Sequence, residues 1–378
     1  KHKGIRLNLA SPLMQQNDPA TFEMIGRADT LGVFQIESRA QMSMLPRMKP
    51  VNFYDIAIQV AIVRPGPIQG DMVHPYLKRR QNPELVDYPS PRLKAVLKKT
   101  LGVPLFQEQA MQVAIVGAGF AAIEADRLRR AMATFKSSGD IGEFGPKLIE
   151  GMRRNGISET FAAQMVEQIK GFSNYGFPES HAASFAKIAY ASSWMKCHHP
   201  DVFCTALLNA QPMGFYAPAQ LIRDARTHGV EARAVCINDS DWDTRMVPEG
   251  SNPRARDSRF CGTEADWAGL QPIRLGMRIV QGLSQEDAEA ILKARAQAPF
   301  ASIEDVWRRA RVKPAALERL ARADAFRAPR TAARQALWAI RGLGQAPLDL
   351  FAAADARMDA SMAEIIEPQV ALLPLTEG

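Results

Sequence analysis

Apolar residues recur at spacings of three and four along most of this chain, and this repeat limits its fold more than any other feature. Such a period is typical of amphipathic helices that bury one face. Helix start and stop signals divide the chain into segments. Asn17-Asp18-Pro19 precedes a segment over residues 22–28, and Pro65 and Pro67 end an apolar run over residues 54–63. The clearest further segments span residues 108–116, 123–133, 161–169 and 182–197. We therefore predict a mainly α fold.

The chain changes character along its length, and these changes predict four regions. Residues 1–235 are mostly helical with short loops. Residues 236–268 collect Pro, Gly, Asn and Asp, and we expect a linker with a few short strands there. Residues 269–341 are again helical and basic, whereas residues 342–378 are acidic and Ala-rich, as expected of a linker. The predicted architecture is a multi-helical domain followed by a small helical domain.

Basic charge is concentrated late in the chain. Among 378 residues, 47 Lys and Arg exceed 40 Asp and Glu, so the net charge is +7 and the pI is about 9.3. Residues 269–345 carry 14 Lys or Arg against 7 Asp or Glu, while residues 346–378 carry one Arg against six acids. A basic helical module beside an acidic tail indicates a polyanionic partner such as nucleic acid. The hydrophobic content of 47% excludes a disordered or fibrous protein.

Cysteine spacing indicates no metal site. The four cysteines are Cys197, Cys204, Cys236 and Cys261, and none forms a Cys-x-x-Cys pair. His198 and His199 follow Cys197, but no second ligand pair follows at zinc spacing, so we interpret the cysteines as free thiols in a reducing cytoplasm. The longest apolar stretch, residues 113–123, is too short to span a bilayer, so we expect no membrane association. Because the chain starts at Lys1 without a leader, we expect a piece of a longer polypeptide.

A cationic cluster on the predicted helix over residues 123–133 is a candidate phosphate site. Asp126 is four residues before Arg130 and is expected to pair with it, which leaves Arg129 and Lys136 relatively free. Guanidinium groups bind phosphate oxygens in bidentate fashion. The alternative is an ordinary solvated basic helix face.

A second candidate is the Gly- and aromatic-rich segment before the helix over residues 182–197. Ser180 is a plausible N-cap, and a helix N-terminus after such a turn offers N–H groups to an anion. Tyr175 could stack on a base and His181 could contact a phosphate. The alternative is a loop whose aromatics fill the core. Arg64, displayed on the rigid turn Arg64-Pro-Gly-Pro67, carries little information alone.

Residues 273–292 have the pattern of a helix-hairpin-helix. An apolar helix over residues 273–280 is expected to lead into a hairpin at Gly282 and then into a second helix, whose Ala288 permits close packing. Hairpin N–H groups bind the DNA backbone without reading sequence. A degenerate copy follows over residues 300–325, and a plain helical hairpin is the alternative. The predicted DNA contacts are Arg274, Arg278, Gly282, Ser284, Lys293 and Arg295.

A short apolar peptide lies between the basic segment and the acidic linker. Gln345 is followed by Leu348, Leu350 and Phe351 in a Pro- and Ala-rich stretch. Large side chains exposed in this way are suited to anchor in a partner's pocket. The alternative is that they pack back on their own domain.

Together, several motifs resemble the C-family bacterial DNA polymerases, the alpha subunit of DNA polymerase III and its relatives. The matching stretches are residues 32–39, 64–67, 106–109, 128–132 and 175–181. Residues 177–185, 197–200 and 208–216 look like the error-prone branch of that family. The resemblance implies polymerase fingers over residues 1–235 and tandem helix-hairpin-helix motifs over residues 269–341. Asp324 stands where the family would have glycine, which weakens the case for DNA contact by the second hairpin.

The resemblance also implies a function for the parent protein. It would be a DNA-directed DNA polymerase acting in damage-induced mutagenesis and translesion synthesis, with primer-template DNA, dNTP, a sliding clamp and other mutagenesis accessory proteins as partners. Arg64, Arg129, Arg130, Lys136, Tyr175, Ser180 and His181 would face the nucleotide, and Gln345 to Phe351 would bind the clamp. No Pro-Asp-x-Asp-x-Asp segment occurs, so we expect Mg²⁺ to be bound upstream, and no catalytic or metal-binding residue in this chain. A replicative alpha subunit and a non-catalytic DNA-binding or clamp-adaptor protein are the alternatives.

Overall fold

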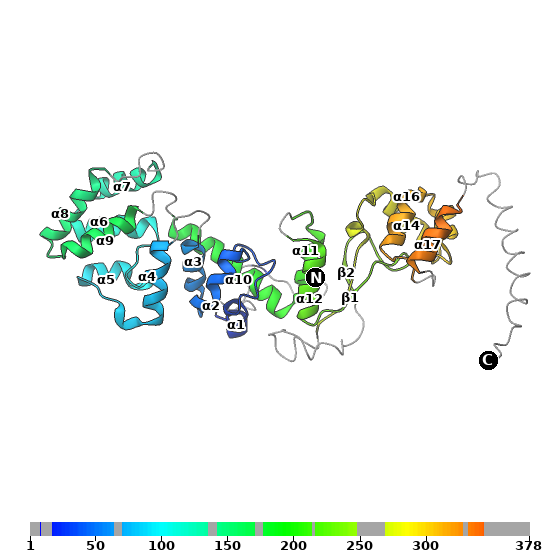
Figure 1. Ribbon diagram of the computed structural model, residues 1–378, viewed down its shortest axis with the longest axis horizontal. Helices are drawn as coiled ribbons and strands as arrows, with labels where there is room; N and C mark the ends of the chain where they lie inside the picture. Colours follow the sequence, from blue (N-terminus) through cyan, green and yellow to red (C-terminus); the bar gives the residue numbers. More distant parts are fainter. Residues whose placement is uncertain are drawn as a thin grey trace, which may run out of the picture. The chain divides into compact units, whose positions relative to one another are not determined.

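The structure is a computed structural model that describes residues 8, 17–63, 70–134, 142–170, 177–213, 216–247, 269–327 and 332–343, without the side chains of 70–74 and 133–134. These residues form two compact units (Figure 1). Of the described residues, the first unit contains those up to Glu231 and residues 269–271, and the second contains residues 232–247, 272–327 and 332–343. Within the described ranges, no helix is long and apolar enough to cross a membrane.

The first unit is built of helices, as the apolar period predicts. Asp18 caps the first helix by accepting a hydrogen bond from the Thr21 amide, and Gly119 ends the sixth in a left-handed conformation. The helices are α1 (Pro19–Gly26), α2 (Arg39–Met48), α3 (Phe53–Ile62), α4 (Gly70–Gln81), α5 (Pro91–Leu97), α6 (Gln107–Ala118), α7 (Ala122–Thr134), α8 (Phe144–Arg154), α9 (Glu159–Lys170), α10 (Glu179–His198), α11 (Pro200–Asn209) and α12 (Pro218–Thr227).

The described residues of this unit form two hydrophobic cores. In one, α10 packs against α3, α1 and α11, and its small residues Ala182, Ala186 and Ala189 are fully buried. In the other, α5 to α9 pack around the buried side chains of Leu93, Leu128 and others. Short side chains permit close approach of helix backbones, which explains why α10 can be buried on several sides.

A buried ionic network joins α10 to α12 and to the loop after α1. The Lys196 ammonium, 1% exposed, lies 3.0 Å from Asp29 and 2.9 Å from Asp224, and donates to the Leu31 carbonyl. His228 Nε2 lies 2.7 Å from the Asp29 carboxylate, so His228 joins the network through Asp29. Buried charges of this kind are tolerated because each has an opposite partner and hydrogen bonds. The network fixes the end of α10 relative to α12.

The second unit combines a small sheet with short helices. Its strands are β1 (Ala232–Arg233), β2 (Arg245–Met246) and β3 (Ile273–Arg274), in the order β1-β3-β2, with β3 parallel to β1 and antiparallel to β2. The helices are α14 (Gln285–Arg295), α15 (Ile303–Ala310), α16 (Pro314–Arg322) and α17 (Ala333–Arg341). The mainly α fold with a few short strands is confirmed.

One helix prediction in this unit is wrong. Residues 273–280 do not form an apolar helix, because Ile273 and Arg274 pair in β3 and only Met277–Ile279 form a short 3₁₀ turn. The backbone explains the difference. A side chain at Gly276 would lie 2.4 Å from the Trp242 carbonyl oxygen, so the chain passes close to its neighbour here instead of coiling. A short apolar run cannot be assigned to helix or strand from its period alone.

Candidate nucleotide and nucleic-acid interfaces

The hairpin before α14 carries two of the predicted DNA contacts, Gly282 and Ser284, and both are exposed. Gly282 has a φ of +79°, a left-handed conformation that favours glycine, and it is exposed. The Ser284 hydroxyl accepts a hydrogen bond of 3.1 Å from the Asp287 amide and so caps α14. The turn therefore presents backbone to solvent at the start of a capped helix.

Two arginines of α16 lie beside this hairpin, and sequence reasoning did not select them. A Cβ atom added at Gly282 would lie 3.0 Å from Nε of Arg319, so the arginine side chain packs over the glycine. Arg319 and Arg322 are both exposed, and they line a groove of about 650 Å³ together with Val280 and Gln281 of the hairpin. Their spacing of three residues on one helix face was the available signal, but nothing in the sequence places α16 against the hairpin.

Three of the predicted DNA contacts are arginines that form ion pairs within the second unit. Arg274 pairs with Asp239 at 3.2 Å and Arg278 pairs with Asp243 at 2.8 Å. Arg295 is 16% exposed and pairs with Asp241 at 2.8 Å. It also donates to the carbonyl oxygens of Ile237 and Ser240, at 3.2 and 2.6 Å. These guanidinium groups hold the loop before β2, whereas Lys293 is exposed on α14.

The same three aspartates form an alternating Asp-x-Asp-x-Asp run at residues 239–243, without a preceding proline. Paired carboxylates of this kind can hold Mg²⁺ when they converge on one ion. Here each carboxylate faces a different arginine, as the three ion pairs show. The run stabilises the second unit and does not form a two-metal site.

At the position where glycine was expected, the second hairpin has a left-handed backbone conformation like that of Gly282 in the first. Asp324 has a φ of +57°, and its amide donates to the Ala321 carbonyl at 2.9 Å. Aspartate tolerates the left-handed region better than most residues. Its carboxylate pairs with Arg327, so an ion pair stands at this turn. The geometry of the turn is retained although the glycine is not.

On α7, a single carboxylate holds both predicted phosphate ligands. Asp126 pairs with Arg130 at 2.6 Å, as expected, but also with Arg129 at 2.9 Å. The expectation that Arg129 stays free is wrong, because residues three and four positions along a helix both reach the same side chain. These side chains are 42% exposed for Arg129 and 74% exposed for Arg130. The two hydrogen bonds from Arg129 and the one from Arg130 hold the pKa of Asp126 below its usual range.

At the start of α10, the N-cap prediction is wrong. Pro178 occupies the N-cap position and Ser180 is the second residue of the helix, with its side chain exposed. The Glu179 amide donates to the Glu108 carboxylate of α6 at 3.0 Å, so an acidic side chain already occupies this helix N-terminus. His181 lies between Phe177 and Phe185, with ring centroids 4.9 and 4.2 Å away. The aromatics at this point pack on one another.

The Phe106–Gln109 segment, one of the stretches that carry the family resemblance, joins these elements. Besides the Glu108 contact to α10, the buried Gln109 side chain accepts a hydrogen bond from the Leu105 amide and donates to Thr100 Oγ1, both at 2.9 Å. A buried amide satisfied in this way fixes the loop before α6. The other predicted site residues lie outside the described residues: Arg64, Lys136, Tyr175, Gln345, Leu348, Leu350 and Phe351.

Comparison with known proteins decides the family. The bacterial DNA polymerase III alpha subunit finger domain matches residues 1–156, and a helix-hairpin-helix motif matches residues 229–337. The chain is 60% identical over 376 residues to error-prone DNA polymerase 1 of Agrobacterium fabrum, a match covering 99% of this chain and 33% of that protein. The chain belongs to the C family of bacterial DNA polymerases. Its family and its error-prone branch are thus as predicted.

Two further relatives of this chain carry the same kind of name. It is 57% identical over 379 residues to error-prone DNA polymerase 2 of Rhizobium meliloti, covering 100% of this chain and 33% of the relative. It is 54% identical over 385 residues to the error-prone DNA polymerase of Sinorhizobium medicae, covering 100% of this chain and 34% of the relative. The chain therefore spans about a third of the length of these relatives.

Proposed function

We propose that this chain supplies the fingers and the duplex-binding hairpins of a DNA-directed DNA polymerase that copies damaged templates with low fidelity. The observation that carries the proposal is the presence, in one chain, of the finger-domain match and of a helix-hairpin-helix unit whose exposed Gly282 turn is flanked by Arg319. Relatives named error-prone DNA polymerases, over the full length of the chain, support the branch.

The second unit would hold duplex DNA through its backbone. Gly282 lets a phosphate approach the hairpin amides, and Ser284 positions them by capping α14. Arg319 and Arg322 of α16, with Lys293 of α14, would neutralise neighbouring phosphates because all three are exposed. In this proposal Arg274, Arg278 and Arg295 act indirectly, by holding the loop that supports the hairpin.

The first unit would bind the incoming dNTP. Arg129 and Arg130 are fixed by Asp126 yet retain exposed guanidinium surface, which suits bidentate contact with a triphosphate. Ser180 and His181 would contribute from α10, and the family resemblance adds Arg64, Lys136 and Tyr175 to the proposed nucleotide contacts.

A clamp contact through Gln345, Leu348, Leu350 and Phe351 is likewise proposed on the sequence pattern. Replacing Leu350 and Phe351 by Ala should abolish clamp binding in a calorimetric titration while the melting temperature stays nearly unchanged.

DNA polymerases generally use divalent metal ions, and we propose Mg²⁺ for the parent enzyme. The described residues do not fit a magnesium site. Asp29 and Asp224 converge, but they face the Lys196 ammonium and His228. Magnesium prefers oxygen ligands and keeps several waters, which this closed ionic network does not offer. The carboxylates that hold the ions would come from outside this sequence, and no reaction step is assigned to its residues.

Kinetics of the full-length parent polymerase tests the proposal. Replacing Arg129 or Arg130 by Ala should lower kcat/KM for dNTP by an amount equivalent to roughly 1–3 kcal/mol, because a charge-assisted contact to the triphosphate is lost. Arg153→Ala, which removes an exposed arginine of α8 paired with Glu150, is the matched control and should change little. A folded parent protein that does not extend a primer with Mg²⁺ and dNTP would favour the adaptor alternative. Unchanged kinetics in both arginine variants would reject the nucleotide contacts.

A further inference from the structure

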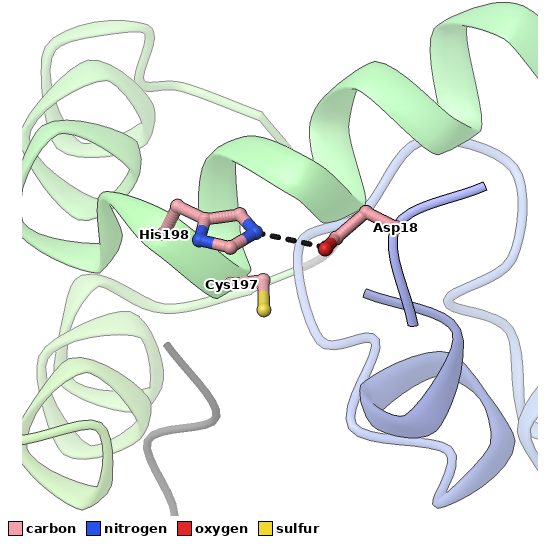
Figure 2. Close-up of side chains that lie close together, drawn as sticks. All are labelled: Asp18, Cys197 and His198. Carbon is pink, nitrogen blue, oxygen red and sulfur yellow. Dashed lines mark hydrogen bonds and ion pairs between the residues drawn. The ribbon is translucent and has the colours of Figure 1, made fainter. Parts of the chain in front are cut away.

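Three side chains with metal-binding atoms meet where α10 ends, in the first unit (Figure 2). Cys197 and His198 are the last two residues of α10, and Asp18 lies directly before α1. One ligand atom from each side chain lies within 4.8 Å of the other two. Cys197 is fully buried and carries no disulfide, and His198 is 9% exposed. The cluster joins two segments that are about half the chain apart.

The donor set suits zinc better than magnesium or calcium. A thiolate, an imidazole and a carboxylate are the ligands that Zn²⁺ takes, whereas the harder ions prefer oxygen alone. In a tetrahedral zinc site, nitrogen and oxygen ligands at about 2.1 Å from the ion are roughly 3.4 Å apart. His198 Nε2 and Asp18 Oδ2 are now 2.8 Å apart and joined by a hydrogen bond. An ion would be admitted if this contact opened by roughly half an ångström and Cys197 Sγ settled at about 3.6 Å from the other two ligand atoms.

The surroundings orient the ligands. The Thr21 amide and hydroxyl donate to Asp18 Oδ2 at 2.9 and 2.6 Å, and the Asp18 amide donates to the Tyr190 hydroxyl at 3.1 Å. Such outer contacts fix ligand side chains in metal sites. The position also favours a cation, because Cys197 and His198 lie in the last turn of a 20-residue helix, where the backbone dipole is negative.

We propose that Asp18, Cys197 and His198 bind one Zn²⁺ with a water as fourth ligand, which clasps the start of α1 to the end of α10. The ion would join two elements of the fold, and the proposal does not depend on the proposed polymerase activity. The sequence prediction of no metal site considered spacing around Cys197 alone. Asp18 is too distant in the sequence to enter a spacing pattern, and only the packing of α1 against α10 brings it near.

The test uses the 378-residue chain after removal of metal. We expect it to take up one equivalent of Zn²⁺ from a chromogenic chelator and to gain thermal stability, because only the folded chain holds the ligands together. With Co²⁺ as the probe, a near-ultraviolet thiolate charge-transfer band should appear. Cys197→Ser should remove the band, and Cys197→Ser and His198→Gln should each weaken Zn²⁺ binding by about tenfold or more.

Two further variants keep the result decisive. Asp18→Asn retains an oxygen that can cap α1 but loses the charge, so it should weaken binding even if Cys197→Ser fails to fold. Cys236→Ser removes a buried cysteine of the second unit and should leave one equivalent bound. The proposal is overturned if the folded chain takes up no Zn²⁺ at equimolar concentration. It is equally overturned if the cobalt band survives in Cys197→Ser or if Asp18→Asn and His198→Gln bind normally.

Discussion

At the scale of single residues, the arginines of the second unit divide between holding the fold and facing solvent. Arg295 is mostly buried and donates to two carbonyl oxygens and one carboxylate, whereas Lys293 is exposed on the same helix. Arg295→Ala should therefore lower the free energy of unfolding by roughly 2–3 kcal/mol, because buried acceptors lose their donors. Lys293→Ala should change it by less than about 0.5 kcal/mol. Urea unfolding of both variants checks the difference, and equal stabilities would contradict it.

The ionic network around His228 predicts a pH dependence. Burial alone would lower the pKa of His228, but the hydrogen bond and the charge of Asp29 outweigh it and raise that pKa. For Asp29, burial acts to raise the pKa, yet His228 and Lys196 hold it well below its usual range. The stabilisation from His228 is therefore complete below its unfolded pKa of about 6.5 and is lost as the pH rises through the raised folded value.

Unfolding of the chain followed by circular dichroism should show this effect. Between about pH 6 and pH 8, the first unit should lose stability as the pH rises, and His228→Gln should flatten the dependence. The contribution of Asp29 to stability changes at acidic pH instead. It is present above about pH 3.9 and is lost as the pH falls further. A His228→Gln variant with the same slope between pH 6 and 8 as the unsubstituted chain would be the contrary result.

Residue roles were the least predictable part of the site. The Asp126 pairing with Arg130 followed from helix spacing, but the same carboxylate also takes Arg129. Arg319 could not be placed beside Gly282 from spacing, since the contact depends on how α16 packs. The buried network of Lys196 links residues about two hundred positions apart, and no local pattern contains it.

At the scale of elements, the period of the apolar residues predicted the helices well and failed in one place. The segments expected over residues 108–116, 123–133, 161–169 and 182–197 correspond to α6, α7, α9 and α10. These helices are long enough for their period to be unambiguous. The segment over residues 273–280 was too short, and its pairing with β1 and β2 decided its conformation.

The turn after α16 gives an element-scale prediction. Asp324 adopts a left-handed φ of +57°, which costs a residue with a Cβ roughly 1 kcal/mol and costs glycine little. Asp324→Gly should therefore be more stable than Asp324→Ala by about 1 kcal/mol. Both variants remove the carboxylate, so the comparison isolates the backbone term. Equal melting temperatures for the two would show that the turn relaxes when it is substituted.

At the scale of the whole molecule, the sequence combines a finger-domain match with a helix-hairpin-helix match and has no Pro-Asp-x-Asp-x-Asp segment. It spans about a third of its relatives' length, and its one alternating aspartate run is paired with arginines. We therefore predict that the 378-residue chain alone does not extend a primer in the presence of Mg²⁺ and dNTP. Extension that co-purifies with the chain and is lost in Arg129→Ala would contradict this account.

A salt titration of DNA binding tests the proposal that the Gly282 hairpin and α16 form a duplex-binding surface. The 378-residue chain should bind a fluorescent duplex without sequence preference, and log K should fall with log salt at a slope of roughly −3 to −5. The Arg319→Ala/Arg322→Ala variant should reduce the magnitude of that slope by about 2, while Arg153→Ala should leave it unchanged. Absence of binding at low salt, or a slope that the double variant does not change, would contradict the account.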